Sequence, residues 1–284
     1  MKQHEIPGHV TLSEGRGGLM KVAVETEWST AEIYLHGAHV THFQKKGEAP
    51  LLFMSEKSEF DPTKPIRGGV PVIFPWFGGR EGLPSHGFAR TSAWSLEESS
   101  VFAGGDVMLR FRMPTVDALD VEYVVRVGRQ LSMEFVVTNA GNQDATFETC
   151  FHTYFQIGAI DSIAINGLAG CSYIDKILEG TFTQTDDAIQ IGSEMERVYF
   201  DSMETVEILD AKLARKVRVA KSGSHSTVVW NPWIAKSQRM PDFGDDEYPH
   251  MVCVESGNVA GNSITLSSGS RAIMKVELSS EPLG

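Results

Sequence analysis

The side chains best suited to proton transfer lie in two short segments that are far apart in the chain. His152 stands among aromatic residues in the segment 151–155 (FHTYF), and Glu255 follows the apolar run 251–254 (MVCV). Histidine exchanges protons near neutral pH, and a carboxylate held in a cleft has a shifted pKa. A packed core histidine and a solvated glutamate at the mouth of a strand are the simpler interpretations. Residue type and spacing alone leave these alternatives open.

Two arginines flank a stretch that is rich in glycine, proline and aromatic residues. Arg67 stands near the start of the segment 66–78 (IRGGVPVIFPWFG), and Arg90 closes the segment 83–90 (LPSHGFAR). A guanidinium fork binds carboxylate or phosphate through two parallel hydrogen bonds. Glycine lets the backbone approach a ligand closely, and proline stiffens the path of the chain. The pattern indicates either an anion site or two surface arginines on a tight loop.

Three weaker signals occur elsewhere. The segment 229–233 (VWNPW) offers aromatic faces on which sugars stack, although core packing is the commoner use of tryptophan, and the segment 196–199 (ERVY) is typical of a binding strand or of an exposed strand edge. His36, His39 and His42 are close in sequence. A strand would direct His36 and His42 to one face and His39 to the other. We therefore reject a metal site at these histidines.

The elements that must position these groups are predicted to be short β-strands. Apolar residues alternate over 121–127 and 131–138 around a glycine-containing turn, and the pattern recurs over 263–266 and 271–278, which predicts two hairpins. Further strands are predicted at 21–27, 31–35, 40–43, 107–112, 206–209, 216–219, 227–230 and 251–255. A single helical stretch is predicted around 210–215. Strands joined by loops rather than crossover helices predict an all-β antiparallel sandwich, and we expect one domain over residues 1–284.

Composition excludes several classes of protein. The 284 residues carry 37 acidic and 25 basic side chains, which disfavours a nucleic-acid binder. No apolar stretch approaches the roughly 18–20 residues of a membrane span, and the first eight residues lack an apolar signal core. The three cysteines are far apart and form no CxxC pair, which argues against a disulfide framework or a zinc site. We expect a soluble cytoplasmic protein.

Six segments, taken together and in order, resemble the aldose 1-epimerase superfamily. They are 66–78, 83–90, 151–155, 196–199, 229–233 and 251–255. The similarity is to the hexose-6-phosphate (glucose-6-phosphate 1-epimerase) branch of this superfamily, and it extends from about residue 31 to residue 278. The resemblance implies a galactose-mutarotase-like β-sandwich with the site in a cleft on one sheet.

The resemblance also implies roles for individual residues. His152 matches the general acid of the family, and Glu255 matches its general base. Arg67 and Arg90 match the arginines that hold the phosphate of the sugar. For this chemistry Glu255 must be ionised and His152 protonated, and we expect their mutual proximity to favour both charged states.

Three further positions match substrate contacts of the family. His86 falls where the family has a histidine that contacts the sugar. Ser85 stands where some members have glutamine, so its contact would be shorter or mediated by water. Glu196 stands where the family usually has aspartate, which keeps the carboxylate but extends it by one methylene group.

The resemblance implies an isomerase that interconverts the α and β anomers of hexose 6-phosphates, with glucose 6-phosphate as the first candidate substrate. Ring opening and closure by proton transfer involve no redox step, so we expect neither a metal nor an organic cofactor, and we expect a monomer whose partner is a sugar phosphate. Two alternatives are a mutarotase for unphosphorylated aldoses and a non-catalytic carbohydrate-binding sandwich. A glycoside hydrolase ranks below these, because Glu255 has no evident acidic partner except Glu196.

Overall fold

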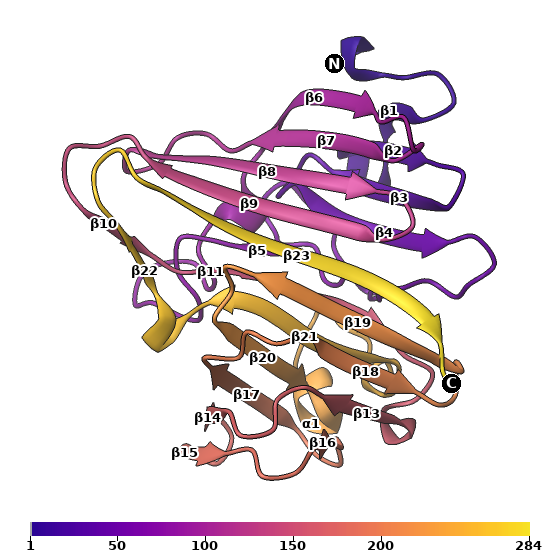
Figure 1. Cartoon of the computed structure of the whole chain (residues 1–284), viewed down its shortest axis with the longest axis vertical. Helices are drawn as coiled ribbons and strands as arrows, with labels where there is room; N and C mark the ends of the chain where they lie inside the picture. The colour runs from indigo at the N-terminus through magenta and orange to yellow at the C-terminus, as the bar shows by residue number, and fades with distance from the viewer. Residues whose placement is uncertain (1) are drawn as a thin grey trace.

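The protein is built almost entirely from antiparallel β-strands (Figure 1). The computed structural model describes residues 2–284. None of the helices within that range has the length and apolar character that crossing a lipid bilayer requires. The predicted all-β antiparallel fold is confirmed.

The largest sheet has nine strands. In spatial order they are β16 (Ala188–Ile189), β13 (Ile163–Asn166), β18 (Val206–Asp210), β19 (Arg215–Ser222), β23 (Arg271–Pro282), β9 (Leu131–Asn139), β8 (Leu119–Val127), β7 (Val107–Arg112) and β6 (Ser95–Val101). Both predicted hairpin arms of residues 121–138 are present, and Tyr123 pairs with Phe135 across them. Alternate residues of β8 and β9 are buried, as their period of two predicts.

The second sheet has eight strands and carries the candidate site. Seven strands follow the order β15 (Gly180–Thr183), β14 (Ser172–Asp175), β17 (Met195–Phe200), β20 (Ser226–Asn231), β21 (Met251–Asn258), β11 (Thr149–Phe151) and β5 (Val72–Ile73), and β12 (Tyr154–Gln156) also pairs with β21. All residues of β20 and β21 are buried. Because these two strands lie at the centre of the sheet, one face packs on the core and the other forms the floor of the site.

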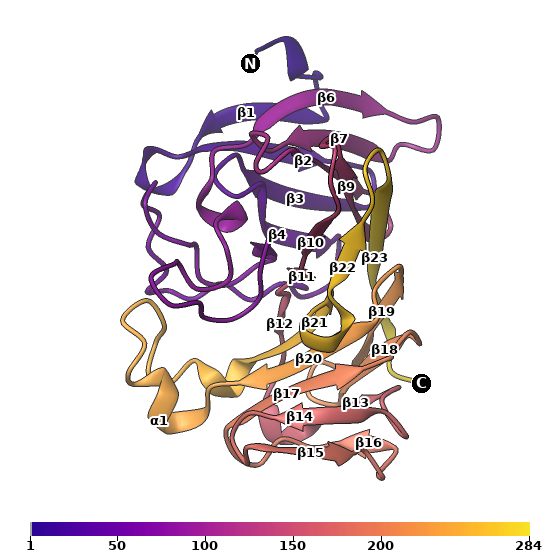
Figure 2. The ribbon, with the colours of Figure 1, turned by 90° about the vertical axis from the view of Figure 1, so that its left-hand side faces the viewer.

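Two smaller sheets and several short helices complete the described chain. The four-stranded sheet contains β1 (Val10–Glu14), β2 (Met20–Glu25), β3 (Ser29–Tyr34) and β4 (His39–Lys45), and the two-stranded sheet contains β10 (Ala145–Phe147) and β22 (Ile264–Leu266). The α-helix α1 spans Trp233–Ser237, and 3-10 helices span Lys2–His4, Arg16–Gly18, Ala89–Thr91, Ile160–Ser162, Tyr248–His250 and Ala260–Asn262. In Figure 2, α1 projects from the same side of the molecule as the purple loops between β4 and β6.

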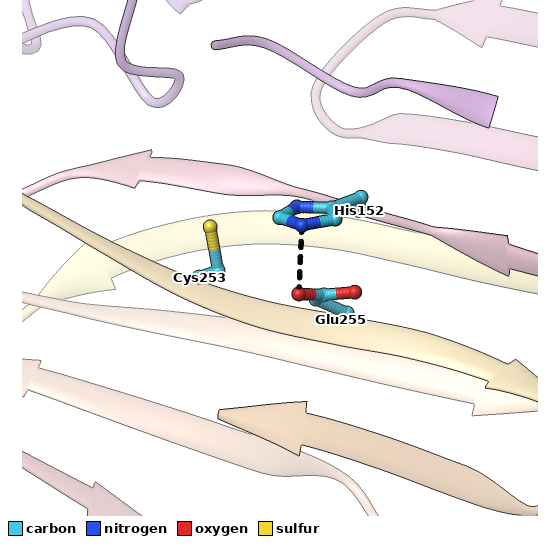
Figure 3. Close-up of side chains that lie close together, drawn as sticks. All are labelled: His152, Cys253 and Glu255. Atoms are coloured by element: carbon cyan, nitrogen blue, oxygen red, sulfur yellow. Dashed lines mark ion pairs between the residues drawn. The ribbon is translucent and has the colours of Figure 1, made fainter. Parts of the chain in front are cut away.

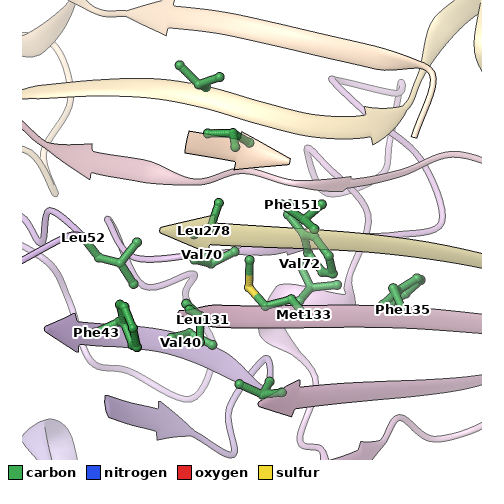
Figure 4. Packing of buried hydrophobic residues seen from close by; sticks show 14 of the residues in the cluster. Val40, Phe43, Leu52, Val70, Val72, Leu131, Met133, Phe135, Phe151 and Leu278 are labelled. Atoms are coloured by element: carbon green, nitrogen blue, oxygen red, sulfur yellow. The ribbon is translucent and has the colours of Figure 1, made fainter. Parts of the chain in front are cut away.

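The main hydrophobic core joins the sheets (Figure 4). The site sheet contributes Phe151, the nine-stranded sheet contributes Met133 and Phe135, and the four-stranded sheet contributes Phe43. The Phe135 ring meets the Phe151 ring nearly at right angles, with centroids 6.1 Å apart. Aromatic contacts of this kind are worth about 0.5–1.5 kcal/mol beyond the burial of their area. The floor of the site therefore rests on a packed and rigid support.

Three predicted elements differ from the structure. The second predicted hairpin is wrong, because β22 pairs with β10 in the two-stranded sheet whereas β23 pairs with β19 and β9 in the nine-stranded sheet. The predicted helix at 210–215 is wrong, because residues 211–214 form a turn between β18 and β19. The carboxylate of Asp210 accepts hydrogen bonds from the backbone amides of Gly158 and Leu213, which stabilises that turn. The strand predicted at 251–255 continues to Asn258, so Glu255 lies within β21 rather than at its mouth.

Candidate active site

His152 and Glu255 face each other across the central strands of the site sheet (Figure 3). Phe151 pairs with Ser256, and Tyr154 pairs with Cys253, so the intervening register places His152 directly opposite Glu255. The Nε2 atom of His152 lies 3.2 Å from Oε1 of Glu255. Successive side chains of a strand point to opposite faces of the sheet. Val254 packs in the main core, so the side chain of Glu255 points to the opposite face.

The imidazole of His152 is held by aromatic neighbours. It stacks on the Tyr154 ring with centroids 4.9 Å apart and meets the edges of Trp230 and His86 at 5.9 Å and 5.7 Å. Its backbone N–H donates to the carbonyl of Pro71 rather than to β21. These contacts fix the ring with Nε2 directed at Glu255, so this nitrogen is the one placed for proton transfer.

The carboxyl group of Glu255 is almost completely buried, with 1% of the residue exposed. Oε1 faces His152, and Oε2 accepts a hydrogen bond from the thiol of Cys150 at a sulfur–oxygen distance of 3.6 Å. A thiol is a weak donor. The two oxygens of the carboxyl group are thus in different surroundings, and only Oε1 faces an imidazole.

Burial sets the charge of this pair. It raises the pKa of the Glu255 carboxyl well above its ordinary value, and it lowers the pKa of the His152 imidazole well below its ordinary value. Our expectation that proximity would favour both charged forms is therefore wrong for the unliganded site. Desolvation opposes the charged form of each of these two buried groups.

Two arginines lie at one end of the site in different electrostatic environments. Arg67 donates from Nε to Oδ2 of Asp242 at 3.1 Å and from Nη1 to the hydroxyl of Tyr154 at 2.8 Å. Burial opposes its charge, but Tyr154 and Asp242 raise its pKa overall. Arg90 donates from Nη2 to the carbonyl of Ser85 at 2.8 Å. Burial, with a smaller contribution from Arg67, lowers the pKa of Arg90 to about 10, so this guanidinium stays charged at neutral pH and is held without a carboxylate among its hydrogen-bond partners.

His86 is a neutral donor at the same end of the site. Its Nδ1 accepts a hydrogen bond from the backbone amide of Gly78 at 3.3 Å, which assigns the ring hydrogen to Nε2. Burial, with Arg90 and Arg67 adding to it, lowers the pKa of His86 to about 3. The ring therefore offers an uncharged N–H group, which suits a sugar oxygen.

Glu196 lies on β17 beside Trp230 of β20. Its Oε2 accepts a hydrogen bond from the ammonium group of Lys236 at 2.9 Å, and Lys236 also lies 3.6 Å from Glu194. Lys236 belongs to α1, which follows the end of β20 (Figure 2). The carboxylate of Glu196 is therefore oriented by a lysine rather than free in solvent.

These groups line one cleft of about 630 Å³. That volume lies within the roughly 300–1,000 Å³ of ordinary small-molecule sites. The lining includes all seven residues singled out from the sequence: Arg67, Ser85, His86, Arg90, His152, Glu196 and Glu255. Segments separated by as many as 188 positions in the chain thus meet at a single site.

Sequence reasoning missed several residues of the cleft. Lys176, Lys236 and Met240 line it, and Asp242 holds Arg67 from the same loop as Met240. Glu148 links two segments that line the cleft, since its carboxylate accepts hydrogen bonds from the backbone amides of Phe77 and Ala260. These residues stand outside any chemical pattern in the sequence, apart from the position of Glu148 close to the segment 151–155.

The three histidines at 36, 39 and 42 bind separate partners. Nε2 of His36 lies 2.8 Å from the carbonyl of Lys64, and Nε2 of His39 lies 2.7 Å from the carbonyl of Gly68. His42 contacts the hydroxyl of Thr30. The three side chains point in different directions because side chains alternate along β4, which carries His39 and His42, and because His36 lies in the segment before β4.

Comparison with known proteins places the chain in a family. The family model described as aldose 1-epimerase matches residues 20–279. A Cenchrus ciliaris protein that is provisionally named a glucose-6-phosphate 1-epimerase is 34% identical over 272 residues, which cover 89% of this chain and 82% of that protein. An Escherichia coli protein with the same provisional name is 33% identical over 246 residues, which cover 83% of this chain and 82% of the other.

Solved structures show the same fold. A provisionally assigned mutarotase from Salmonella typhimurium superposes with a TM-score of 0.90 at 26% identity, covering 98% of this chain and 96% of that one. A galactose mutarotase-like protein from Clostridium acetobutylicum superposes with a TM-score of 0.75 at 12% identity, covering 96% and 98% of the two chains. The predicted galactose-mutarotase-like fold is confirmed, and by its sequence the chain belongs to the aldose 1-epimerase family.

Proposed function

We propose that the protein interconverts the α and β anomers of hexose 6-phosphates, with glucose 6-phosphate as the first candidate substrate. The observation that carries this proposal is the pair formed by His152 and Glu255, which stand opposite each other on the floor of a cleft with Arg67 and Arg90 at one end. The relatives from C. ciliaris and E. coli carry provisional names for the same activity.

Anomer exchange requires two coordinated proton transfers. Glu255 removes the proton from the anomeric hydroxyl while His152 donates a proton to the ring oxygen, and the ring opens to the aldehyde. Rotation about the bond between C1 and C2, followed by closure with the two roles reversed, gives the other anomer. Each positioned proton-transfer group contributes about 10²–10⁴-fold to such a rate.

The burial of the pair supports this chemistry. Opening the ring leaves a neutral His152 and a protonated Glu255, which is the charge state that burial favours at this site. The ion pair that precedes ring opening is the state that burial disfavours. Desolvation therefore favours the charge state that the pair has in the open-chain intermediate.

The arginines support a phosphorylated substrate. Arg90 donates to a backbone carbonyl, and its charge is offset less directly than that of Arg67, which Asp242 neutralises. A phosphate on the sugar would complete the hydrogen bonding of Arg90 with charge-assisted bonds. The formal charge of −12 repels an anion at long range, but salt screens this repulsion beyond about 8–10 Å.

The test is anomer exchange of glucose 6-phosphate measured by NMR exchange spectroscopy, after subtraction of the spontaneous rate. We expect exchange by the natural protein and a loss of at least a hundredfold in the Glu255→Gln variant. Glu122→Gln is the matched control, since Glu122 pairs with Arg112 far from the cleft on β8. Undiminished exchange by Glu255→Gln removes Glu255 as the base, and the absence of exchange by the natural protein rejects the proposed activity.

A further inference from the structure

A thiol stands beside the proposed catalytic pair. Cys253 precedes Glu255 by two positions on β21, so both side chains project from the same face of the sheet. Figure 3 shows the Cys253 sulfur alongside the His152 ring, above the strand that also carries Glu255. One ligand atom from each of His152, Cys253 and Glu255 lies within 4.8 Å of the other two, and all three residues are buried.

These atoms form a donor set of nitrogen, sulfur and oxygen that suits a borderline-soft divalent cation. Zn²⁺ binds imidazole, thiolate and carboxylate, and a site with three protein ligands keeps its fourth position open. Tetrahedral bonds of about 2.0–2.1 Å to nitrogen and oxygen place those two atoms about 3.3 Å apart. The distance between Nε2 of His152 and Oε1 of Glu255 is 3.2 Å, so these two ligands are already spaced for the ion.

We infer that His152, Cys253 and Glu255 form an inhibitory binding site for Zn²⁺-like cations. The ion binds the thiolate, the neutral imidazole and the carboxylate, so the protons that these groups carry are released to solvent, and no oxidation state changes. The Cys253 sulfur approaches by a side-chain adjustment of about 1 Å, because tetrahedral ligand atoms lie roughly 3.3–3.6 Å apart. Cation binding at this site stands on the geometry of the three side chains alone, and only its inhibitory effect rests on the proposed function.

The surroundings suit a bound ion on both sides. Behind the sulfur, Cys253 belongs to an apolar cluster with Phe53, Tyr154, Trp230 and Phe243, which excludes water from that side. In front, His152 and Glu255 line the cleft, which supplies the open fourth position and the path of entry. A hydrophobic shell of this kind controls solvent access to a metal centre.

A bound ion and a sugar compete for the same place. The ion lies between Nε2 of His152 and Oε1 of Glu255, where the proposed mechanism places the oxygens of the anomeric centre. Each ligand therefore weakens the apparent affinity of the other, and the ion removes both proton-transfer groups from use. A millimolar sugar phosphate should protect the site from the cation.

The test uses Co²⁺ as a spectroscopic probe for this class of cation. Chelator-treated protein without a histidine tag is titrated with Co²⁺, and the near-ultraviolet absorption of a cobalt–thiolate bond is followed. We expect one equivalent per chain, displaced by Zn²⁺. Cys253→Ser and Cys253→Ala should lose the thiolate band and weaken Zn²⁺ binding at least tenfold, and circular dichroism reports whether each variant is folded.

The chain offers two matched controls. Cys150 contacts the other oxygen of the same carboxyl group, and Cys171 is a free thiol outside the cleft. Cys150→Ser and Cys171→Ser should retain the band. Its absence from the natural protein, or its loss in Cys150→Ser with retention in Cys253→Ala, overturns the proposed site. Because the band is measured without substrate, it separates failure of this site from failure of the epimerase proposal.

Discussion

His152 and Glu255, 103 positions apart in the chain, face each other where the short break between β11 and β12 lies beside β21. The pairs formed by Phe151 with Ser256 and by Tyr154 with Cys253 enclose this position. Directly opposed residues have Cβ atoms about 4.5–5.5 Å apart, which brings an imidazole and a carboxyl group into contact at 3.2 Å. The spacing of the acid and the base is therefore a property of the sheet rather than of mobile loops.

The first prediction concerns the coupling of these two residues. We expect His152→Asn and Glu255→Gln each to lower the exchange rate of glucose 6-phosphate anomers by about 10²–10⁴-fold. The double variant should lose little more than the worse single variant, because both groups act on one transition state. NMR exchange spectroscopy measures all three rates. Losses that multiply would mean that the residues act in separate steps.

The second prediction concerns the phosphate. Replacing Arg90 with alanine removes a charge-assisted contact worth about 1.5–3 kcal/mol, so KM for glucose 6-phosphate should rise roughly tenfold to a hundredfold. KM for free glucose should change less than about twofold. Steady-state kinetics with both sugars measure the difference, and Arg110→Ala is the control, because Arg110 pairs with Glu98 on the nine-stranded sheet. Equal effects on both sugars would favour a mutarotase for unphosphorylated aldoses.

The third prediction concerns Lys221, whose ammonium group lies behind the site sheet and donates to the Thr227 hydroxyl at 2.6 Å. Burial lowers its pKa from 10.5 to about 8. Between these values the unfolded chain binds a proton that the folded chain has released, so this residue makes stability rise with pH over that interval. We expect a gain on the order of 2 kcal/mol or less.

Urea unfolding at pH 7.5, 8.5 and 9.5 measures this gain as a difference between the natural protein and Lys221→Met, which cancels the titration of other groups. Lys212→Met is the control, since Lys212 is exposed in the turn after β18. Parallel pH dependences for the natural protein and Lys221→Met would contradict the prediction.

The fourth prediction concerns the support beneath the site. Phe135 is 1% exposed and packs against the rings of Phe74, Tyr123 and Phe151. Phe135→Ala should lower the free energy of unfolding by about 3–5 kcal/mol, because it leaves a cavity between the sheets. Phe102→Ala is the comparison, since Phe102 is 44% exposed, and its cost should stay below about 1 kcal/mol. Similar midpoints in urea for the two variants would show that the core tolerates the cavity.

Local patterning predicted most of the strands because the signal is carried by neighbouring residues. The alternation in β8 and β9 is visible over nine residues each, and the buried run of β21 is continuous. The helix α1 was missed because five residues are too few for a helical period, and its position depends on contacts of Asn231 and Ser237. The turn after β18 resembled a helix because its residues, Ala211 to Ala214 (AKLA), are all strong helix formers.

By itself, the sequence determined the residue types of the site, the antiparallel β character and, through six ordered segments, the family. Only the tertiary structure decided that Glu255 lies within a buried strand opposite His152, that Asp242 neutralises Arg67 across 175 positions, and that Cys253 shares the same face. The physical reason is that charge state and contact depend on desolvation and on strand register. Desolvation and register arise only when distant segments pack together, so they cannot be predicted from residues that are neighbours in the sequence.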